Sequence, residues 1–525
     1  MLSKIYSAGL YGIDGFVVTV EVDARENFAA FELVGLPDMA VKEAKERVRT
    51  ACENTGYLFP ELAYMVNLAP ADRRKEGTVF DVAILVGILR CAGAIDPRSD
   101  LSDSCFLGEL SLSGELRPIR GVLCMCAAAR DAGLRRVYVP RENAAEAAAV
   151  RGIDVYAVGS MRELIAHLNA KEALTPTCPP DFEEELSSIS LPDLSDVRGQ
   201  AMAKRAMEIA AAGGHNILLI GPPGTGKSML AKRLPSILPP LTFEEALQTT
   251  KVHSVTGLLP AGESLLIRRP FRSPHQTMSA VSLVGGGINP MPGEISLAHN
   301  GVLFMDELPE FPKQVTDGLR QPLEDHAVTI TRANGRATFP CSFMLVAAMN
   351  PCRCGYFGHP TRPCTCRRGD VARYLSNISG PMLDRMDIQI ELPSLTYEEI
   401  STPDPDAETS AVVRERVIKA RAFAARRMAA VDAAQGEPPH NDATDAPLCN
   451  ARLDPAGIHR YCRMDADAVQ LLKDAYENLG LSARGHDRIL RVARTIADLE
   501  ESDIIAAHHV AEAIQLRSLD RKYWS

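Results

Sequence analysis

The period of apolar and polar positions changes several times along the chain, and each change predicts a different element. Residues 16–20 are mostly β-branched or aromatic and predict a strand, whereas residues 41–52 repeat apolar positions at helical spacing. Residues 82–89 form an apolar block between two charged residues. Because this block is far shorter than the roughly 20 residues of a membrane helix, we expect it to belong to a protein core.

Two stretches interrupt these patterns. Residues 174–194 are rich in proline, serine and acid, which is typical of a linker, although a long surface loop within one domain has the same composition. A second interruption at 402–455 contains an arginine- and alanine-rich helix at 412–430, followed by a Gly-Glu-Pro-Pro segment at 436–439 that no helix crosses easily. Residues 465–519 predict three helices.

These boundaries predict an α/β protein with several folded parts, as expected for 525 residues. We expect a first domain at 1–170, a linker at 171–190, a core at 191–395, a linker with a helix at 396–455, and a helical C-terminal part at 456–525.

The strongest chemical motif follows an apolar strand predicted at 216–220. Its eight residues are Gly221, Pro222, Pro223, Gly224, Thr225, Gly226, Lys227 and Ser228, and we expect a helix to continue over 229–234. A strand, a glycine-rich loop and a helix in this order are typical of a P-loop, whose backbone N–H groups surround a phosphate. We expect Lys227 to contact the β- and γ-phosphates of ATP and Ser228 to be a Mg²⁺ ligand.

Two further apolar strands end in polar residues suited to the same chemistry. The run 301–305 leads into Asp306 and Glu307, so we expect Asp306 to hold Mg²⁺ and Glu307 to polarise the attacking water. The run 343–349 ends at Asn350, whose amide can bond to that water and to the γ-phosphate. A simple turn residue before Pro351 is the alternative for Asn350.

Composition and charge indicate the class of protein and its cellular compartment. The chain has 57 basic and 67 acidic residues, and its net charge of −10 excludes an overall basic surface for nucleic acid. Hydrophobic residues make up 46% of the chain, which excludes a largely disordered protein. The first residues lack the build of a signal peptide. We therefore expect a cytoplasmic protein with reduced cysteines and no membrane partner.

Positive charge is nevertheless concentrated in three segments. Two of them contain the candidate DNA contacts Arg268, Arg269, Arg272, Arg332 and Arg336, the last two on either side of a hairpin turn predicted at Asn334-Gly335. The third is a cysteine-rich loop near residue 360. Basic inserts on an acidic body are expected of a channel that binds a nucleic-acid backbone. The alternative is that these arginines pair with acids across subunits.

Four of the 13 cysteines lie in that loop. Cys352, Cys354, Cys364 and Cys366 form two Cys-x-Cys pairs separated by nine residues. Four thiolates can hold a structural Zn²⁺ in a closed tetrahedral shell, and His359 could replace one of them. The one-residue spacing within each pair is tighter than the usual zinc spacing, so four reduced thiols in a basic loop are the alternative.

The nucleotide motifs, in this order, resemble those of AAA+ ATPases, which have a P-loop core and a helical lid. The resemblance makes Asn350 the first sensor and Arg385 the arginine finger that acts on a neighbouring subunit's nucleotide, with an ordinary ion pair to Asp384 or Asp387 as the alternative. Arg484 resembles the second-sensor arginine of the lid, and Arg488 is its rival. The resemblance implies a homo-oligomeric ring, usually of six subunits.

The segments between the nucleotide motifs indicate which branch of the AAA+ ATPases the chain resembles. Residues 268–275, 285–287, 292–300 and the hairpin at 328–339 resemble the helix-2-insert and pre-sensor-1-hairpin clade, which includes magnesium chelatase and the MCM helicases. The chain is most similar, over essentially its whole length, to the magnesium-chelatase-like ATPases called YifB or ComM. ComM-type proteins are hexameric helicases that drive branch migration during natural transformation.

This likeness implies an ATP-driven ring motor on single-stranded or branched DNA, used in transformation or recombination. Two other functions stay open: the motor subunit of a metal-insertion complex, as in magnesium chelatase, and a protein-remodelling ATPase.

The first domain resembles the α+β domain of Lon proteases at 75–77, 106–110 and 114–121. That family cuts peptides with a Ser–Lys dyad, but the corresponding positions here hold Val79 and Leu123. The resemblance therefore implies a protease-like fold without protease activity, and Thr78 is the only nearby hydroxyl.

Overall fold

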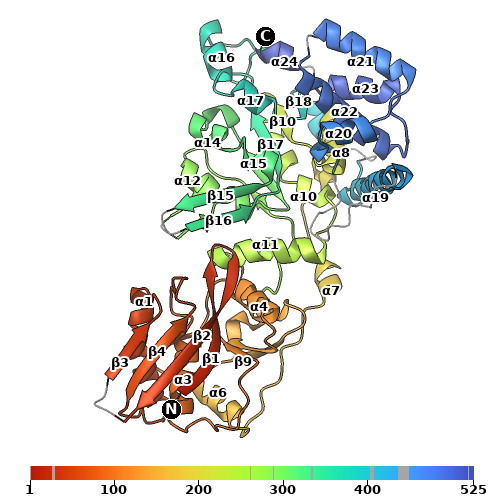
Figure 1. The fold of residues 1–525 in the computed structure, drawn as a ribbon. Helices are drawn as coiled ribbons and strands as arrows, with labels where there is room; N and C mark the ends of the chain where they lie inside the picture. The colour runs from red at the N-terminus through yellow and green to blue at the C-terminus, as the bar shows by residue number, and fades with distance from the viewer. Residues whose placement is uncertain are drawn as a thin grey trace.

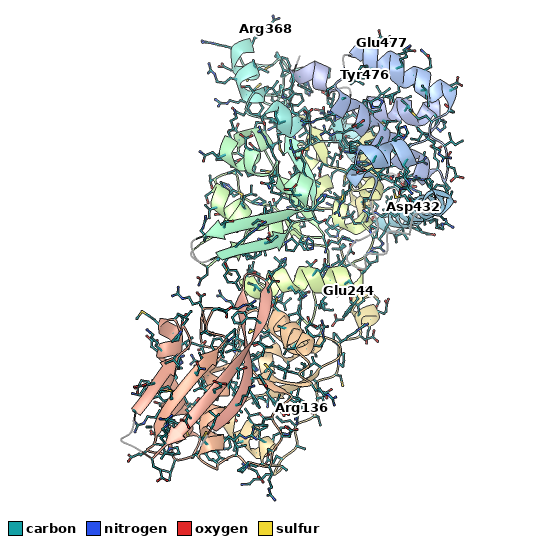
Figure 2. All side chains as sticks on the ribbon, viewed as in Figure 1. Arg136, Glu244, Arg368, Asp432, Tyr476 and Glu477 are labelled. Carbon is teal, nitrogen blue, oxygen red and sulfur yellow. The ribbon has the colours of Figure 1, made fainter. Side chains whose placement is uncertain are left out.

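The computed structural model describes residues 2–26, 30–187, 189–260, 262–287, 289–332, 335–401, 407–435, 449–479, 481–517 and 519–524. Figure 1 shows an N-terminal domain at one end and a larger half that carries the nucleotide motifs and the C-terminal helices. Helix α11 (Phe243–Thr256) lies along their junction, where Figure 2 marks Glu244. The Gly-Glu-Pro-Pro segment 436–439 and Asn334 of the predicted turn lie outside the described residues.

The N-terminal domain is built on a mixed sheet of seven strands in the order β3-β4-β2-β1-β5-β8-β9. The β1–β2 and β2–β4 pairs are antiparallel and the other pairs are parallel. The strands are β1 (Leu2–Tyr11), β2 (Asp14–Arg25), β3 (Ala30–Val34), β4 (Ala63–Ala69), β5 (Ser104–Phe106), β8 (Arg136–Pro140) and β9 (Asp154–Val158). The strand predicted at 16–20 lies within β2, which is confirmed.

Helices cover this sheet. The apolar block at 82–89 lies in α3 (Asp81–Cys91), whose residues 81–89 are all buried and which packs on β1 and β2, so its assignment to a core is confirmed. The helix predicted at 41–52 is present as two pieces that break at Glu43. The remaining elements are α1 (Met39–Lys42), α2 (Ala44–Asn54), β6 (Glu109–Leu110), β7 (Leu116–Arg117), α4 (Val122–Asp131), α5 (Ala144–Ala148) and α6 (Met161–Leu168).

The predicted linker contains a short helix, α7 (Phe182–Ser187). The Phe182 ring is buried and meets the Phe243 ring of α11 edge-on, with centroids 5.6 Å apart. The Ser264 hydroxyl donates a hydrogen bond to Glu185 at 2.8 Å. This segment therefore packs on the junction between the two halves of the molecule.

A five-stranded, all-parallel sheet forms the centre of the larger half, in the order β11-β14-β17-β10-β18. The strands are β11 (Phe271–Arg272), β14 (Val302–Met305), β17 (Met344–Met349), β10 (Ile217–Ile220) and β18 (Ile388–Glu391). Alternate side chains of β10, β14 and β17 enter two different hydrophobic cores. Because both faces are covered, these strands are continuous apolar runs.

One face of this sheet packs on α8 (Ala201–Gly213) and the C-terminal helices. These helices are α19 (Ser410–Gln435), α20 (Pro455–Tyr461), α21 (Ala466–Leu479), α22 (Ala483–Leu499) and α23 (Ala507–Gln515). The three helices predicted at 465–519 are confirmed as α21 to α23, and the helix predicted at 412–430 lies within α19. The buried Asp498 carboxylate of α22 accepts hydrogen bonds from Arg427, Arg494 and Asn450, which ties α19 and α22 together.

The other face packs on shorter elements, most of which lie between the strands. The elements on this side are α12 (Ala280–Val284), β12 (Gly285–Gly286), β13 (Met291–Pro292), α13 (Glu294–Leu297), α14 (Lys313–Gly318), α15 (Pro322–Asp325), β15 (Ala327–Arg332), β16 (Gly335–Pro340), α16 (Arg368–Leu375), α17 (Gly380–Leu383) and the C-terminal α24 (Leu519–Trp524). Helix α18 (Tyr397–Ser401) follows β18, and its Tyr397 is exposed. The predicted hairpin is present as the antiparallel pair β15–β16. Among the described helices, none has the length and apolar content needed to cross a membrane.

Candidate functional site

The P-loop lies at the carboxyl end of the parallel sheet, directly after β10. It leads into α9 (Lys227–Ala231), and α10 (Leu234–Ile237) begins separately because Pro235 occupies its first turn. The helix predicted at 229–234 is therefore interrupted at 232–233. Gly226 has a φ of 88°, in the left-handed region that favours glycine. At Gly221, an added methyl group would lie 2.6 Å from the Leu392 carbonyl oxygen, so only glycine fits.

Lys227 is buried within this loop. Its amine donates to the carbonyl oxygens of Gly221 and Pro222 at 2.7 and 2.8 Å and to Oδ1 of Asn350 at 3.0 Å. Burial lowers the pKa of Lys227 to about 8, against the opposite effect of the Asp306 and Glu307 carboxylates. Within the part of the chain that the structure describes, no acid forms a direct ion pair with this amine, so its charge is available to an incoming phosphate.

The acids expected at the end of β14 lie beside the P-loop. The Ser228 hydroxyl donates to Oδ2 of Asp306 at 2.7 Å, so the two predicted Mg²⁺ ligands are already in contact. Their hydroxyl and carboxylate oxygens are the donors that Mg²⁺ prefers, so this pair fits the ion. Glu307 is exposed and has a φ of 53°, an uncommon conformation for a non-glycine residue that is often found at functional sites.

The cysteine-rich loop begins two residues after Asn350. The Sγ atom of Cys352 lies 3.3 Å from that of Cys354 and 3.7 Å from that of Cys364, and the Sγ atoms of all four cysteines lie within 4.8 Å of one another. Four sulfurs at about 2.3 Å from one Zn²⁺ would be about 3.8 Å apart, so the cluster fits a tetrahedral ion.

The His359 ring lies outside this cluster. Its Nδ1 accepts hydrogen bonds from the backbone of Thr361 and Arg362, and its Nε2 lies 2.9 Å from Ser394 Oγ. The prediction that His359 could replace a cysteine is therefore wrong, because both of its ring nitrogens already have partners.

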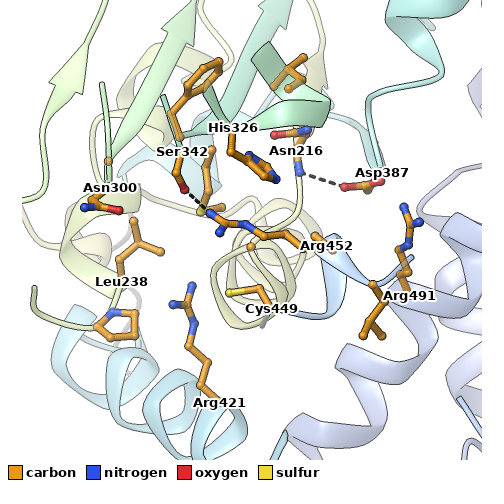
Figure 3. A pocket seen from close by; sticks show the side chains of 18 of the residues that line it. Asn216, Leu238, Asn300, His326, Ser342, Asp387, Arg421, Cys449, Arg452 and Arg491 are labelled. Carbon is orange, nitrogen blue, oxygen red and sulfur yellow. Dashed lines mark hydrogen bonds between the residues drawn. The ribbon is translucent and has the colours of Figure 1, made fainter. Parts of the chain in front are cut away.

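At the opposite, amino end of the parallel sheet lies a cavity of about 880 Å³. Figure 3 shows Asn216, Asn300 and Ser342, which precede β10, β14 and β17, on one side and arginines of α19 and α22 on the other. Seven arginines line the cavity: Arg269, Arg385, Arg421, Arg452, Arg484, Arg488 and Arg491. Burial, followed by the charge of Arg452, lowers the pKa of both His299 and His326 to about 4, so these lining histidines are neutral at pH 7.

Arg385, the expected arginine finger, belongs to this cavity. Its guanidinium donates to Glu324 at 2.6 Å and to the carbonyl oxygens of Pro381 and Arg320. The ion pair is therefore with Glu324 rather than with the predicted alternatives Asp384 and Asp387. Arg385 lies at the amino end of the sheet and the P-loop of the same chain at the carboxyl end.

The two candidate second-sensor residues lie beside Arg385. Arg484 is exposed and Arg488 is nearly buried, and each has a guanidinium nitrogen 3.8 Å from Asp384. Burial lowers the pKa of Arg488 to about 10, although Asp387 and Asp384 oppose this. Nη1 of Arg488 and Nε of Arg491 are buried without a hydrogen-bond partner in the described structure. Neither candidate therefore lies at its own P-loop.

The predicted DNA contacts fall into two groups. Arg268, Arg332 and Arg336 are exposed. In contrast, Arg269 is nearly buried and donates to Glu245 and to the carbonyl oxygens of Pro239 and Asn300, and Arg272 makes a bidentate pair with Glu294 at 2.7 Å. This corrects the assignment of Arg269 and Arg272 to DNA, because both guanidinium groups are already used within the chain.

The segment that resembles Lon proteases shows no amine next to the candidate hydroxyl among its described residues. The Thr78 hydroxyl donates to Glu109 at 2.5 Å, and the buried Lys75 amine donates to the carbonyl oxygens of Arg73 and Pro70. Val79 and Leu123 are both buried.

Several cavity residues were not predicted from the sequence. Arg421 donates to the Ala211 carbonyl oxygen, and Arg452 donates to Ser342, as Figure 3 shows for the latter. A signal for one of the missed residues did exist, because positions 484, 488 and 491 share one face of a helix. Arg491 could therefore have been grouped with the other two arginines.

Comparison with known proteins places these features in one family. The model of magnesium chelatase subunit ChlI matches residues 193–400, and models of two further parts of that subunit match residues 20–143 and, for its C-terminal part, 407–517. YifB of Salmonella typhimurium, an uncharacterized protein, is 40% identical over 520 residues, which cover 99% of this chain and 98% of YifB.

Two further relatives extend this comparison. The competence protein ComM of Haemophilus influenzae is 41% identical over 525 residues, with 99% of this chain and 98% of ComM covered. Lon protease of Brucella suis is 23% identical over 151 residues, which cover 28% of this chain and 18% of that protease. The chain belongs to the magnesium chelatase ChlI-like family of ATPases, together with its full-length YifB and ComM homologues.

Proposed function

We propose that this ATPase works as a ring of six copies, as its AAA+ likeness implies, and moves on DNA as a branch-migration helicase. The observation that carries the ring is the separation of the P-loop from Arg385, Arg484 and Arg488. The β10 and β17 strands between the two ends have four and six residues, which span about 13 to 20 Å. An arginine side chain cannot bridge that distance to its own nucleotide.

A neighbouring copy resolves this separation. If the amino-end cavity of one subunit faces the P-loop of the next, Arg385 meets the γ-phosphate there and stabilises the charge of the transferred phosphoryl group. Arg488 lies 3.8 and 3.5 Å from carboxylate oxygens of Asp384 and Asp387, but its buried Nη1 and the buried Nε of Arg491 have no hydrogen-bond partner among the described residues. These open donors support an anionic guest in the cavity. In each site, Glu307 polarises the water, Asn350 orients it, and Lys227 and the Ser228–Asp306 pair hold the phosphates and Mg²⁺.

The DNA assignment rests on the exposed side of the β15–β16 hairpin. This side presents Thr329, Thr331, Thr338 and Arg336, while the opposite side is apolar and buried. Arg332 follows the apolar side chains at the turn end of β15 and is exposed there. No carboxylate among the described residues forms an ion pair with either arginine. Short hydroxyl side chains and free guanidinium groups are suited to contacts with a phosphate backbone rather than to base reading. The ComM name of one relative agrees with such a substrate.

ATP turnover over a salt series, with and without branched DNA, tests this function. We expect DNA to stimulate turnover at low salt, and the stimulation to fade as salt rises. The Arg332→Ala/Arg336→Ala variant should lose most of this stimulation. An Arg368→Ala/Arg373→Ala variant removes the same charge from α16, which Figure 2 places at the end of the larger half away from the hairpin, and should keep it. Turnover indifferent to DNA at low salt contradicts the proposal and favours a metal-insertion motor of the chelatase type.

The cysteine cluster is the proposed site of one structural Zn²⁺ per chain. Its loop rests on the P-loop, because a methyl group added at Gly355 would lie 2.5 Å from Cδ of Pro223. Zn²⁺ would hold Cys352, and with it the neighbouring Asn350, in place. Metal analysis should find one zinc per chain, lost in Cys352→Ser/Cys364→Ser and kept in Cys178→Ser, which changes an exposed cysteine outside the cluster. A zinc-free wild-type protein purified under reducing conditions contradicts the site.

A further inference from the structure

The β15–β16 hairpin forms a sheet of only two strands. A two-stranded hairpin is marginally stable by itself, so its position depends on what its apolar side contacts. Val328, Ile330, Ala337 and Phe339 make up that side, and all four are buried. Gly285 of β12 lies against Ile330, since a methyl group added there would be 3.1 Å from Ile330 Cδ1. The nucleotide half thus supplies one part of this support.

The N-terminal domain supplies another part. Figure 1 shows the β1–β2 turn extending from that domain towards β16. A methyl group added at Gly12 would lie 3.1 Å from Cβ of Ala337 and 3.6 Å from the Phe339 ring. One added at Gly335 would overlap the Tyr11 hydroxyl oxygen. Tyr11 and Ile13 are both partly buried against the core that contains the hairpin's apolar side chains.

A second contact fixes the N-terminal domain in this position. The Gly121 N–H donates to the Ser254 carbonyl oxygen of α11 at 3.1 Å, and the Ser254 hydroxyl donates to the buried Glu146 carboxylate. Glu146 also accepts a hydrogen bond from the Leu123 N–H at 3.1 Å. Burial raises the pKa of Glu146, although these donors lower it. Because α4 is held on α11, the β1–β2 turn is held against the hairpin.

We propose that Tyr11, Gly12 and Ile13 position the β15–β16 hairpin for DNA, with Tyr11 as the principal positioning residue. This inference rests on the proposed DNA function of the hairpin. It gives the domain that resembles a protease a role without proteolysis: it supports the apolar side of the hairpin, opposite to Arg336 and the exposed threonines. The Tyr11 ring supports the tip, where Gly335 leaves no room for a side chain between them.

Three variants of the full-length chain test the inference. Tyr11→Ala removes the supporting ring, Tyr11→Phe keeps the ring and removes only the hydroxyl, and Tyr6→Ala truncates a tyrosine of the same strand that packs on the domain's own core. Hydrogen–deuterium exchange of residues 327–340 reports hairpin order without DNA. The DNA concentration that gives half-maximal stimulation of turnover reports its function.

We expect Tyr11→Ala to speed exchange in the hairpin and to raise the half-maximal DNA concentration on the order of tenfold, because a loosened hairpin must be ordered on binding. Its turnover without DNA and its KM for ATP should match wild type. Tyr11→Phe should restore both readouts, and Tyr6→Ala should change neither.

Hairpin exchange in Tyr11→Ala that equals wild type overturns the positioning role. So does a half-maximal DNA concentration that stays at the wild-type value while exchange rises. A wild-type protein that DNA does not stimulate instead contradicts the proposed function, and the exchange data then still decide whether Tyr11 supports the hairpin.

Discussion

The two ends of the central parallel sheet carry different chemistry, and we propose that they form the two halves of one site. At the carboxyl end, glycine backbone, one lysine and two acids surround the space for a phosphate and Mg²⁺. At the amino end, arginines from the core and from the C-terminal helices surround a cavity of about 880 Å³. The first end is suited to bind a nucleotide and the second to stabilise its transition state. The comparison indicates that one chain carries both sets of residues, but its own arginines lie too far from its own P-loop to act on the nucleotide there.

The largest effect is expected at the amino end. Arg385→Ala should lower ATP turnover by about a thousandfold or more, as for arginine fingers in general, because developing phosphoryl charge loses its partner. Nucleotide affinity should stay near wild type, since the P-loop of the same chain is untouched. Steady-state turnover and fluorescent-nucleotide titration measure the two quantities. A loss of affinity equal to the loss of turnover would place Arg385 at its own nucleotide instead.

A smaller loss is expected when the water-polarising acid at the carboxyl end is changed. Glu307→Gln should lower turnover by about 10² to 10⁴, with ATP binding retained. Glu310→Gln changes an exposed acid three residues away and serves as the matched control, with turnover near wild type. Equal turnover in the two variants would show that Glu307 is not the base.

The amino end should also be the more sensitive to damage in the C-terminal helices. Asp498→Ala leaves the buried Arg427 and Arg494 without their shared carboxylate, so we expect about 3–5 kcal/mol less stability. Asp467→Ala, on the exposed side of α21, should change stability little. Chemical denaturation monitored by circular dichroism tests this. Similar unfolding midpoints for the two variants would contradict the structural role of Asp498.

The pH dependence of ATP affinity tests the state of Lys227 at the carboxyl end. The pKa of Lys227 is about 8 in the nucleotide-free protein, below its ordinary value, and phosphate oxygens favour the charged amine. ATP binding therefore takes up a proton above pH 8, and affinity should fall by about tenfold per pH unit there. Calorimetric titrations between pH 7 and 9.5 measure this, with Lys227→Arg as the variant that stays charged. A wild-type affinity that stays constant over this range contradicts the lowered pKa.

The carboxyl end could be predicted from the sequence because its signals are local. Gly221 to Ser228 are contiguous, and Asp306 and Asn350 follow recognisable apolar strands. The strands of the parallel sheet were also within reach as apolar runs, and the helical C-terminal part through its helical period. The α+β character of the N-terminal domain came from its resemblance to Lon proteases and not from a period. The break of the helix at Glu43 and the restart at Leu234 could not be predicted, because they depend on local caps and Pro235.

The amino end could not be predicted in the same way because its residues are distant in sequence. Arg421 and Arg452 reach the cavity only through the packing of α19 and the segment after it on the core. Arg269 and Arg272 were assigned to DNA because counting charges does not reveal partners such as Glu245 and Glu294, which only the fold brings near. The support of the hairpin by Tyr11 joins residues more than 300 positions apart.

Mixing two inactive variants tests most directly whether the site is shared between chains. Lys227→Ala cannot bind nucleotide productively but keeps the arginine cavity, whereas Arg385→Ala keeps the P-loop and lacks the finger. We expect each alone to be inactive and an equimolar mixture, after subunit exchange, to regain a measurable part of wild-type ATP turnover. A mixture that forms mixed oligomers and stays as inactive as either variant alone would contradict the account.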